Sequence, residues 1–379
     1  MPGPSTTAVH AGEGDPRSGA VNTPVHQSTT FRFPERADGT TSDLIYTRYD
    51  NPSVQAIEAK LAALEGAGAV LAFGSGMAAA QSLCTAVLRP GDTLAVQRGV
   101  YGGTVAYLME ELAPWGVGVH TFDAGAEPDL PAGVRLVWVE SVTNPLLRVA
   151  DLPAWADAAH EAGAALAVDA TFATPALQRP LELGADFVLH SASKYLGGHS
   201  DVIAGFLASP ADRRQELWQR RRNLGGVLDP HAAYLLGRGM KTLALRMERH
   251  GRNALRLARL AAGHAAVVAA HHPGLPSHPD HDVAGRLLAG PVGVLTLDLG
   301  SLDAARAFRR ATRLFVPAAS LGGVESLVSL PLETSHAYAP AEARRRDGIT
   351  DGLVRLSVGI EDAEDLEADL MQALDASKA

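Results

Sequence analysis

Short apolar runs alternate with helical patterns through the middle of this 379-residue sequence. The runs have the length of strands, and they are AVLAF (69–73), TLAVQ (93–97), LVWVES (136–141), ALAVDA (165–170), FVLHS (187–191) and IAGFLA (203–208). Between them, stretches such as LPAWADAAHEAG (152–163) carry apolar residues at helical spacing and end in glycine. This alternation predicts an α/β fold with a mostly parallel sheet covered by helices on both faces.

The same pattern divides the chain into three parts. Residues 1–60 are irregular and are expected to form an N-terminal arm, and residues 61–240 a large domain. A long helical pattern over 229–262, forming one or two helices, leads into the remaining part, residues 241–379. We therefore expect a bridging helix followed by a smaller C-terminal α/β domain.

Within the C-terminal part, GVLTLDL (293–299) and LVRLSVGI (353–360) are predicted strands, each followed by a helix. The segment HHPGLPSHPDHD (271–282) contains four histidines, which raises the question of a metal site. Its prolines and glycine interrupt any helical ligand spacing, so we expect a surface loop and no metal.

Composition excludes several classes of protein. A net charge of −9 argues against a general nucleic-acid binder, and the basic cluster RRQELWQRRR (213–222) is expected to be a helix face. The N-terminus lacks the features of a signal peptide, and no apolar run is long enough to span a membrane. The single cysteine, Cys84, rules out an internal disulfide. A cytoplasmic protein with no membrane partner is predicted.

One lysine lies where α/β sheets bind ligands. The segment HSASKYLGGHSD (190–201) places Lys194 just after the strand predicted at 187–191, at its carboxyl end. By itself this position is equally consistent with a solvated loop lysine. Other features of the sequence decide between these two interpretations.

Two of these features are suited to an anionic or charged ligand. FGSGMAAAQSL (73–83) runs from a strand through a glycine turn into a helix, so that backbone N–H groups at Ser75, Gly76 and Met77 form a potential phosphate site. Small residues there also serve simply to let a strand turn into a helix. In AVDATFATP (167–175), Asp169 ends an almost wholly apolar strand. It is either a cap or a partner for a protonated pyridine nitrogen, as in pyridoxal phosphate enzymes.

Two further features involve aromatic side chains. GVYGGTV (99–105) places Tyr101 in a glycine-rich turn, where its ring can lie over a flat cofactor or pack in the core. In the arm, YTRYDNPS (46–53) places Tyr46 and Arg48 two residues apart, on one side of an extended segment. Arginine is suited to bidentate phosphate binding, although an arm arginine can also be merely solvated.

Taken in order, these segments resemble the Cys/Met-metabolism family of pyridoxal phosphate (PLP) enzymes. The resemblance covers nearly the whole chain and also includes ESVTNP (140–145), SLGGVES (320–326) and GLVRLSVGIED (352–362). It implies fold type I of the PLP enzymes, with a mostly parallel seven-stranded sheet and a smaller C-terminal domain. It further implies a homotetramer, a dimer of dimers, with active sites shared between neighbouring subunits.

The resemblance assigns roles to individual residues. Lys194 matches the lysine that binds PLP covalently and then moves the substrate's Cα proton, and Asp169 matches the partner of the pyridine nitrogen. Tyr101 matches the ring-stacking tyrosine and is the expected acid at the departing sulfur, with Tyr46 as its relay. Further cofactor contacts are implied for Tyr46 and Arg48 of the neighbouring subunit and for Ser75, Gly76, Met77, Thr171, Ser191 and Ser193. Substrate contacts are implied for Asn144, Ser320 and Arg355, with Arg355 as the carboxylate fork. Ser193 replaces the family's usual threonine.

The pocket sequence favours one branch of this family. Cystathionine-handling γ-enzymes usually carry glutamate just before the residue that matches Ser320, whereas this chain has Ala319. Ala319 resembles the methionine γ-lyase pattern better. Three other residues depart from that pattern, namely Gly103, Arg221 and Arg222. We expect a carbon–sulfur lyase that performs γ-elimination on methionine or a related thioether amino acid. The alternatives are a cystathionine γ-lyase or a γ-replacement enzyme using an O-acylhomoserine. A PLP-binding protein with a regulatory or scaffolding role is disfavoured, because it would need no carboxylate fork.

Overall fold

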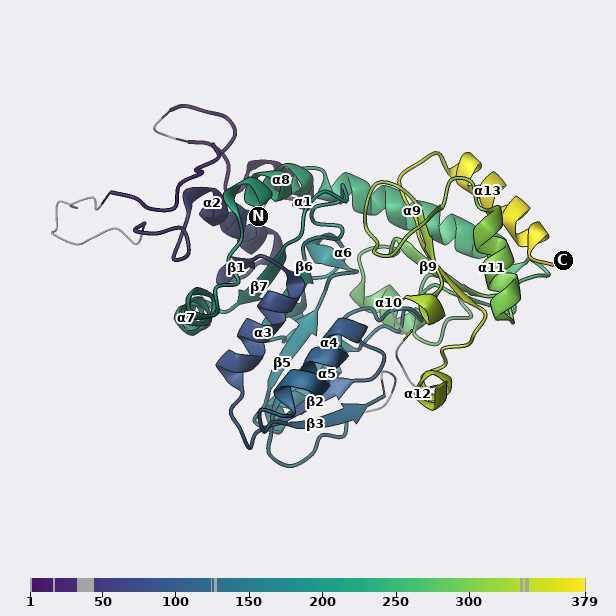
Figure 1. The fold of residues 1–379 in the computed structure, drawn as a ribbon, viewed down its shortest axis with the longest axis horizontal. Coiled ribbons are helices and arrows are strands. Elements are labelled where there is room, and N and C mark those ends of the chain that lie inside the picture. Colours follow the sequence, from purple (N-terminus) through teal and green to yellow (C-terminus); the bar gives the residue numbers. More distant parts are fainter. Residues whose placement is uncertain are drawn as a thin grey trace.

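A seven-stranded sheet forms the centre of the larger part of the molecule (Figure 1). The computed structural model describes residues 2–15, 18–32, 44–123, 125, 128–334, 337 and 341–378. The strand order is β1-β7-β6-β5-β4-β2-β3, and only β7 runs antiparallel to its neighbours. Strand bounds are β1 Ala69–Phe73, β2 Thr93–Gln97, β3 Gly118–Phe122, β4 Val134–Glu140, β5 Ala165–Asp169, β6 Phe187–Ser191 and β7 Gly205–Ser209. The predicted mostly parallel sheet is confirmed, and β3 was missed.

Alternate residues of each strand pack on opposite faces of the sheet, as the two-residue period of a strand requires. Val137 and Val139 of β4 face one core, whereas Leu136 and Trp138 face the other. The first core is covered by α2 Pro52–Glu65, α5 Leu152–Glu161 and α8 Pro230–Met240. The second is covered by α3 Gly76–Val87, the segment that contains α4 Gly102–Tyr107, and α7 Arg214–Leu224. Two short helices, α1 Pro4–His10 and α6 Thr174–Leu177, complete this part.

The C-terminal part has its own sheet and core. Its five strands are ordered β10-β11-β12-β9-β8. Their bounds are β8 Ala269–His271, β9 Val294–Asp298, β10 Val316–Pro317, β11 Leu327–Ser329 and β12 Leu353–Ser357. Helix α13 packs beside the long helix α9, and α11 packs beside α13 (Figure 1). The helix bounds are α9 Leu243–Ala262, α10 His281–Leu287, α11 Leu302–Ala311, α12 Ala341–Arg346 and α13 Ala363–Ala376. The two predicted strands and the helix after each are therefore present.

The long helix α9 contributes to both cores. Met247 near its start packs in the first core of the large sheet, and Leu257 packs in the C-terminal core. The helical pattern over 229–262 forms two helices, α8 and α9, separated at Lys241 and Thr242. We propose α9 as the bridging element between the large domain, 61–240, and the C-terminal domain, 241–379. The boundary of the arm, 1–60, falls inside α2.

The histidine-rich segment 271–282 runs mostly as turns between β8 and α10, in agreement with the predicted loop, but none of its four histidines is exposed. His272 is 0% exposed; its Nδ1 accepts the Gly274 N–H at 3.0 Å, and its Nε2 donates to the Val292 carbonyl at 3.1 Å. His278 has the same two-sided arrangement, between Asp280 N–H and the Leu146 carbonyl. Backbone partners hold these rings, an interaction that residue spacing does not reveal.

Acid is expected to weaken the fold through His272. Burial lowers the pKa of His272 to about 4, and a ring nitrogen that must accept an N–H cannot also carry a proton. Stability from the neutral ring is complete above pH 6.5 and is lost as the pH falls toward 4, because the unfolded chain takes up the proton first. His272→Asn keeps an acceptor without titrating. In urea titrations, the parent should exceed the variant in unfolding free energy at pH 7. This difference should fall by about 2 kcal/mol at pH 4.5, because only the parent loses the contribution of a neutral His272 ring. A pH-independent difference would contradict this.

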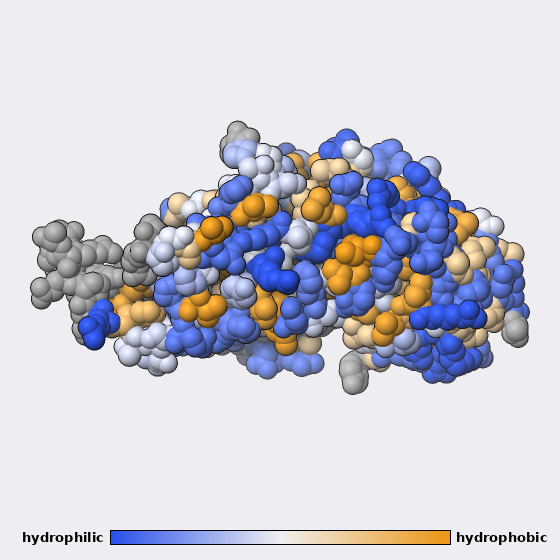
Figure 2. All heavy atoms as spheres, turned by 90° about the horizontal axis from the view of Figure 1, so that it is seen from above, coloured by the Kyte–Doolittle hydropathy of each residue, from blue (hydrophilic) through white to orange (hydrophobic). Residues whose placement is uncertain are grey.

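Polar side chains cover most of the face seen in Figure 2, where apolar groups are small and separate. Among the described residues, no helix is both apolar and long enough to cross a membrane. Cys84 is buried, and burial raises the pKa of its thiol to about 12. The basic cluster 213–222 lies mainly in helix α7 as predicted, although its Arg221 is buried.

Candidate active site

A cavity of about 590 Å³ opens where β4, β5 and β6 end. Adjacent parallel strands bring their carboxyl ends to one edge of a sheet, so residues distant in sequence meet there. The lining residues predicted from sequence are Ser75, Gly76, Met77, Tyr101, Asn144, Asp169, Thr171, Ser191, Ser193, Lys194, Ser320 and Arg355. The structure therefore brings all the predicted site residues together except Tyr46 and Arg48.

Lys194 lies in the turn that follows β6, with its amine inside the cavity. Its Nζ donates to Ser320 Oγ at 2.6 Å, so that segments 126 positions apart meet across the site. Burial, together with the nearby Arg355 guanidinium, lowers the pKa of Lys194 below its usual value. A lysine whose neutral form is favoured is suited to act as a nucleophile or a base.

The N-terminus of α3 forms a cradle against β6. Ser75 caps the helix by accepting the Ala78 N–H at 3.0 Å, and the Gly76 and Met77 N–H groups in the first turn border the cavity. A Cβ at Gly76 would lie 3.1 Å from the Cβ of Ser191. Glycine thus permits a close approach that leaves the helix end directed at the site, as an anion site requires.

Asp169 is fixed by a chain of hydrogen bonds at the end of β5. Its Oδ1 accepts both the Thr171 hydroxyl, at 2.5 Å, and the Thr171 N–H, at 3.0 Å. The Thr171 hydroxyl oxygen in turn accepts the Ser191 N–H at 2.8 Å. Burial raises the pKa of Asp169, and the two bonds from Thr171 oppose that shift by favouring the carboxylate. A cationic ring nitrogen would supply the charge that this buried carboxylate needs.

Glu140 is a further residue of the site that the sequence analysis did not single out. It ends β4 directly opposite Asp169 in the parallel pair, and its Oε1 accepts the Tyr101 N–H at 2.6 Å. Burial, reinforced by the charge of Asp169, raises the pKa of Glu140 well above its usual range. Glu140 therefore positions the turn that carries Tyr101. Its signal in the sequence was the same as that of Asp169, an acid at the end of an apolar run.

Arg355 on β12 lines the cavity from the five-stranded sheet. It is 6% exposed, and its Nη1 donates to Asn144 Oδ1 at 3.1 Å while its Nη2 donates to the Ser320 carbonyl at 2.7 Å. Burial lowers the pKa of Arg355 to about 10, so the guanidinium stays charged at neutral pH. A fixed, positively charged fork of this kind matches a carboxylate.

Tyr101 is half exposed at the mouth of the cavity, which suits a side chain that contacts a ligand. Its ring lies so close to Gly103 that a Cβ there would be 2.4 Å from Tyr101 Cε1. The glycine therefore determines where the ring can lie. Apolar walls that were not predicted complete the cavity, formed by Ala80, Val142, Phe172, Leu189, Ile203 and Leu321.

Three of the predicted cofactor contacts stay predictions, and two of them were assigned to the neighbouring subunit. Tyr46 and Arg48 lie in the arm and do not line the cavity of their own chain as far as it is described. The Ser193 hydroxyl donates to the Ala204 carbonyl at 3.2 Å and accepts the Ala204 N–H at 3.0 Å. Its only proton is thus used within the protein, so the phosphate contact of Ser193 stays a prediction.

The comparison with known families decides what this site belongs to. The family described as Cys/Met metabolism PLP-dependent enzyme matches residues 5–375. The chain belongs to this family. Members of the Cys/Met metabolism family depend on PLP, and this chain is accordingly a PLP-dependent enzyme of sulfur amino acid metabolism with fold type I.

Relatives within the Cys/Met family carry different activities. A cystathionine γ-lyase of Bacillus subtilis is 42% identical over 98% of both chains. An L-methionine γ-lyase of Pseudomonas putida is 42% identical, covering 100% of this chain and 98% of the relative. The structure of a cystathionine γ-synthase from Xanthomonas oryzae, solved with aminoacrylate and cysteine, superposes with a TM-score of 0.94 at 40% identity, covering 100% and 99% of the two chains. The reaction class is γ-elimination or γ-replacement, and identity alone does not choose between them.

The residues of the cavity fit the cofactor that the Cys/Met family uses. The N-terminus of α3, which Gly76 allows to approach β6 closely, suits the phosphate, and the buried Asp169 carboxylate suits a protonated pyridine nitrogen. Lys194 supplies the amine and Tyr101 an aromatic face. When bound, PLP supplies an electron sink for the negative charge left on the substrate's α-carbon.

Proposed function

We propose that this enzyme performs γ-elimination on methionine or a closely related thioether amino acid, converting methionine and one water molecule into methanethiol, 2-oxobutanoate and ammonia. The observation that supports this is Ala319, which lines the cavity next to Ser320. Its methyl group offers nothing to the distal ammonium group of cystathionine and leaves room for a methylthio group. The apolar walls of the cavity favour the same kind of substituent.

Each residue of the site has a step in this proposal. Arg355, oriented by Asn144 and the Ser320 carbonyl, binds the substrate carboxylate. The Lys194 amine, with its lowered pKa, takes the proton from Cα. The Tyr101 hydroxyl holds the proton that the departing sulfur needs, with Tyr46 as its relay. Asp169 keeps its charge beside the ring nitrogen, and Glu140 keeps Tyr101 in place.

The second candidate is γ-replacement or cystathionine cleavage, as in a cystathionine γ-synthase, an O-acylhomoserine sulfhydrylase or a cystathionine γ-lyase. It is favoured by Gly103, which leaves no side chain between Tyr101 and the neighbouring turn, where methionine γ-lyases carry a cysteine. The same catalytic residues serve both candidates. In γ-replacement a second nucleophile enters after the γ-substituent leaves, whereas cystathionine cleavage differs from the first candidate only in the substrate.

We also propose a homotetramer, a dimer of dimers, in which Tyr46 and Arg48 act in the active site of the neighbouring subunit. Tyr46 is 39% exposed, and neither residue lines the cavity of its own chain as described. Val21 and Val25 of the same arm are exposed as well, at 89% and 39%. A cytoplasmic location remains part of the proposal.

Ala319→Glu is expected to move the substrate preference. We expect the parent to prefer methionine over cystathionine in kcat/KM, and the new carboxylate to shift that ratio toward cystathionine about tenfold by pairing with its ammonium. The measurement compares methionine, cystathionine, homocysteine and O-acetylhomoserine with product analysis, and Ala319→Gln serves as the uncharged control. A parent that strongly prefers cystathionine or gives mainly replacement product would overturn the methionine assignment.

A further inference from the structure

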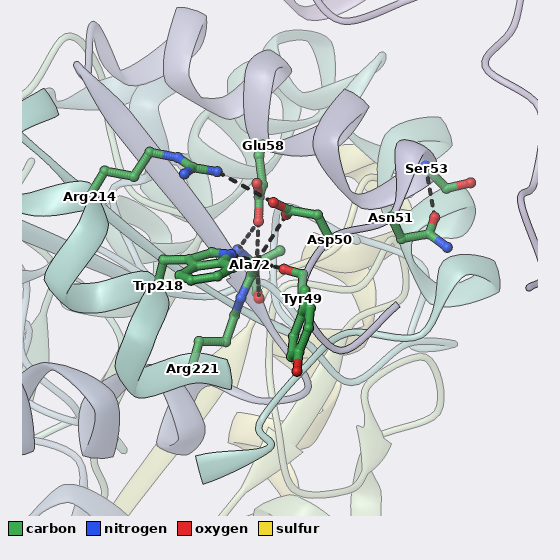
Figure 3. Close-up of polar contacts among 9 residues, drawn as sticks. All are labelled: Tyr49, Asp50, Asn51, Ser53, Glu58, Ala72, Arg214, Trp218 and Arg221. Atoms are coloured by element: carbon green, nitrogen blue, oxygen red, sulfur yellow. Dashed lines mark hydrogen bonds and ion pairs between the residues drawn. The ribbon is translucent and has the colours of Figure 1, made fainter. Parts of the chain in front are cut away.

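The guanidinium of Arg221 is buried between the N-terminal arm and the large sheet (Figure 3). Arg221 belongs to α7 and is 2% exposed, and the two carboxylates beside it, Asp50 and Glu58, are 4% and 6% exposed. Burial raises the pKa of Glu58, and the nearby Arg221 charge opposes that shift. One buried cation therefore serves two buried carboxylates, and the more exposed Arg214 lies 3.8 Å from Asp50 as a second cation. None of these four residues lines the cavity.

The two terminal nitrogens of Arg221 bind different parts of the chain. Nη1 donates to Glu58 Oε1 at 2.5 Å and to the Ala72 carbonyl at 3.2 Å, which are in α2 and β1. Nη2 donates to the Tyr49 carbonyl at 3.1 Å and to Asp50 Oδ1 at 3.2 Å, which are in the arm. The planar fork thus joins the arm to the core, which a single ammonium cannot reproduce.

The part of the arm held in this way is the turn that carries Tyr46 and Arg48. The Tyr49 and Asp50 N–H groups both donate to the Tyr46 carbonyl, at 2.8 and 3.2 Å. Helix α7 holds the turn at two more points, because Trp218 Nε1 donates to the Tyr49 carbonyl at 2.9 Å and Arg48 Nη1 donates to the Arg222 carbonyl at 3.1 Å. The directions of the Tyr46 and Arg48 side chains therefore depend on α7.

We infer that Arg221 is a positioning residue for the active site of a second copy of this chain. It acts through the turn at 46–50, holding Tyr46 and Arg48 in the orientation in which they reach the neighbouring cofactor and substrate. The inference rests on the proposed sharing of the active site between subunits. Arg221 affects a neighbouring subunit more than its own, and this is what separates positioning from ordinary support of the fold.

Arg221→Lys tests this inference, because it keeps the buried charge and removes the fork. The homo-oligomer of this variant should lose about tenfold in kcat/KM, since a turn misplaced by a fraction of an ångström misplaces both side chains. The variant is then co-expressed with a Lys194→Ala chain under a second tag, and hybrids are isolated through both tags. Each hybrid dimer has one site with Lys194 from one chain and an intact arm from the other. Its activity per chain carrying Lys194 should rise at least fivefold, toward the parent value.

Three controls make the result specific. Arg48→Ala, paired with the Lys194→Ala chain in the same way, tests only whether the active site is shared between subunits. It thereby distinguishes a failure of the proposed sharing from a failure of the inference about Arg221. Arg220→Lys makes the same change one residue earlier in α7, where the side chain forms no hydrogen bond or ion pair with any described residue, and should leave activity unchanged. Trp218→Phe removes one N–H donor to the Tyr49 carbonyl, and the hybrid should likewise restore its activity.

The inference is overturned by either of two results. In the first, the Arg48→Ala hybrids regain activity, but the hybrids of the two α7 variants, Arg221→Lys and Trp218→Phe, are no more active than the homo-oligomers of the same variants. This would mean that α7 acts only on its own subunit. In the second, both α7 variants have parent activity before mixing, which would mean that the fork does not matter. Failure of the Arg48→Ala hybrid would instead remove the shared site on which the inference depends.

Discussion

Lys194→Ala should reduce turnover by about 10³-fold or more, because it removes both the covalent attachment of PLP and the base for the Cα proton. Lys194 lies in the turn after β6, and its Nζ is in the cavity beside Ser320 and Arg355. The visible absorbance of lysine-bound PLP should also be lost. The measurement is steady-state turnover of methionine and of cystathionine, with an absorption spectrum of the purified protein.

Lys378→Ala is the matched control for that variant. Lys378 lies near the C-terminus, pairs with Asp375 on the surface and takes no part in the cavity. Its removal should leave both the spectrum and the turnover unchanged. If Lys194→Ala retained turnover within tenfold of the parent, the catalytic amine would have to be another group.

Arg355→Lys should reduce kcat/KM for an amino-acid substrate by about 10²-fold, mainly through KM. The positive charge is kept, but the fork that binds a carboxylate bidentately is lost, and a charged hydrogen bond contributes about 1.5–3 kcal/mol. The spectrum of the bound cofactor should not change, since Arg355 contacts Asn144 and Ser320 and not the cradle at α3. The measurement pairs initial rates over a range of substrate with the absorption spectrum.

The direction of the KM effect distinguishes carboxylate binding from a structural role. A substrate analogue without the α-carboxylate should bind parent and variant equally weakly. If the variant lost kcat and cofactor absorbance together with an unchanged KM, Arg355 would be supporting the fold between β12 and the loop at Asn144, and the fork assignment would be wrong.

The sheet was predictable wherever a strand is buried on both faces. β1, β2 and β6 have the bounds that their apolar runs indicated, because both faces of these strands are covered. β3, Gly118–Phe122, was missed because it lies at the sheet edge, where most of its residues are exposed and carry no apolar run. The short strands β8, β10 and β11 likewise form through their neighbours rather than through a pattern of their own.

The site was predictable where chemistry falls at the end of a strand. Lys194 and Asp169 are charged residues at the ends of apolar strands, and this position alone indicated their roles. Glu140 has the same position, but its role depends on the Tyr101 N–H, which is 39 positions away in the chain. Arg221 lies in a basic run that resembles a solvated helix face. Its carboxylate partners are 163 and 171 positions away, so only the folded chain reveals that its charge is buried.

The most direct test of this account is to locate the cofactor on the chain. The purified enzyme is treated with borohydride, which fixes the bond between PLP and its lysine, and the digested protein is mapped by mass spectrometry. The cofactor mass should appear on the peptide that contains Lys194, in stoichiometric amount. Stoichiometric labelling of another lysine, such as Lys60 or Lys241, or no label on a protein that turns over substrate, would contradict the site at the end of β6.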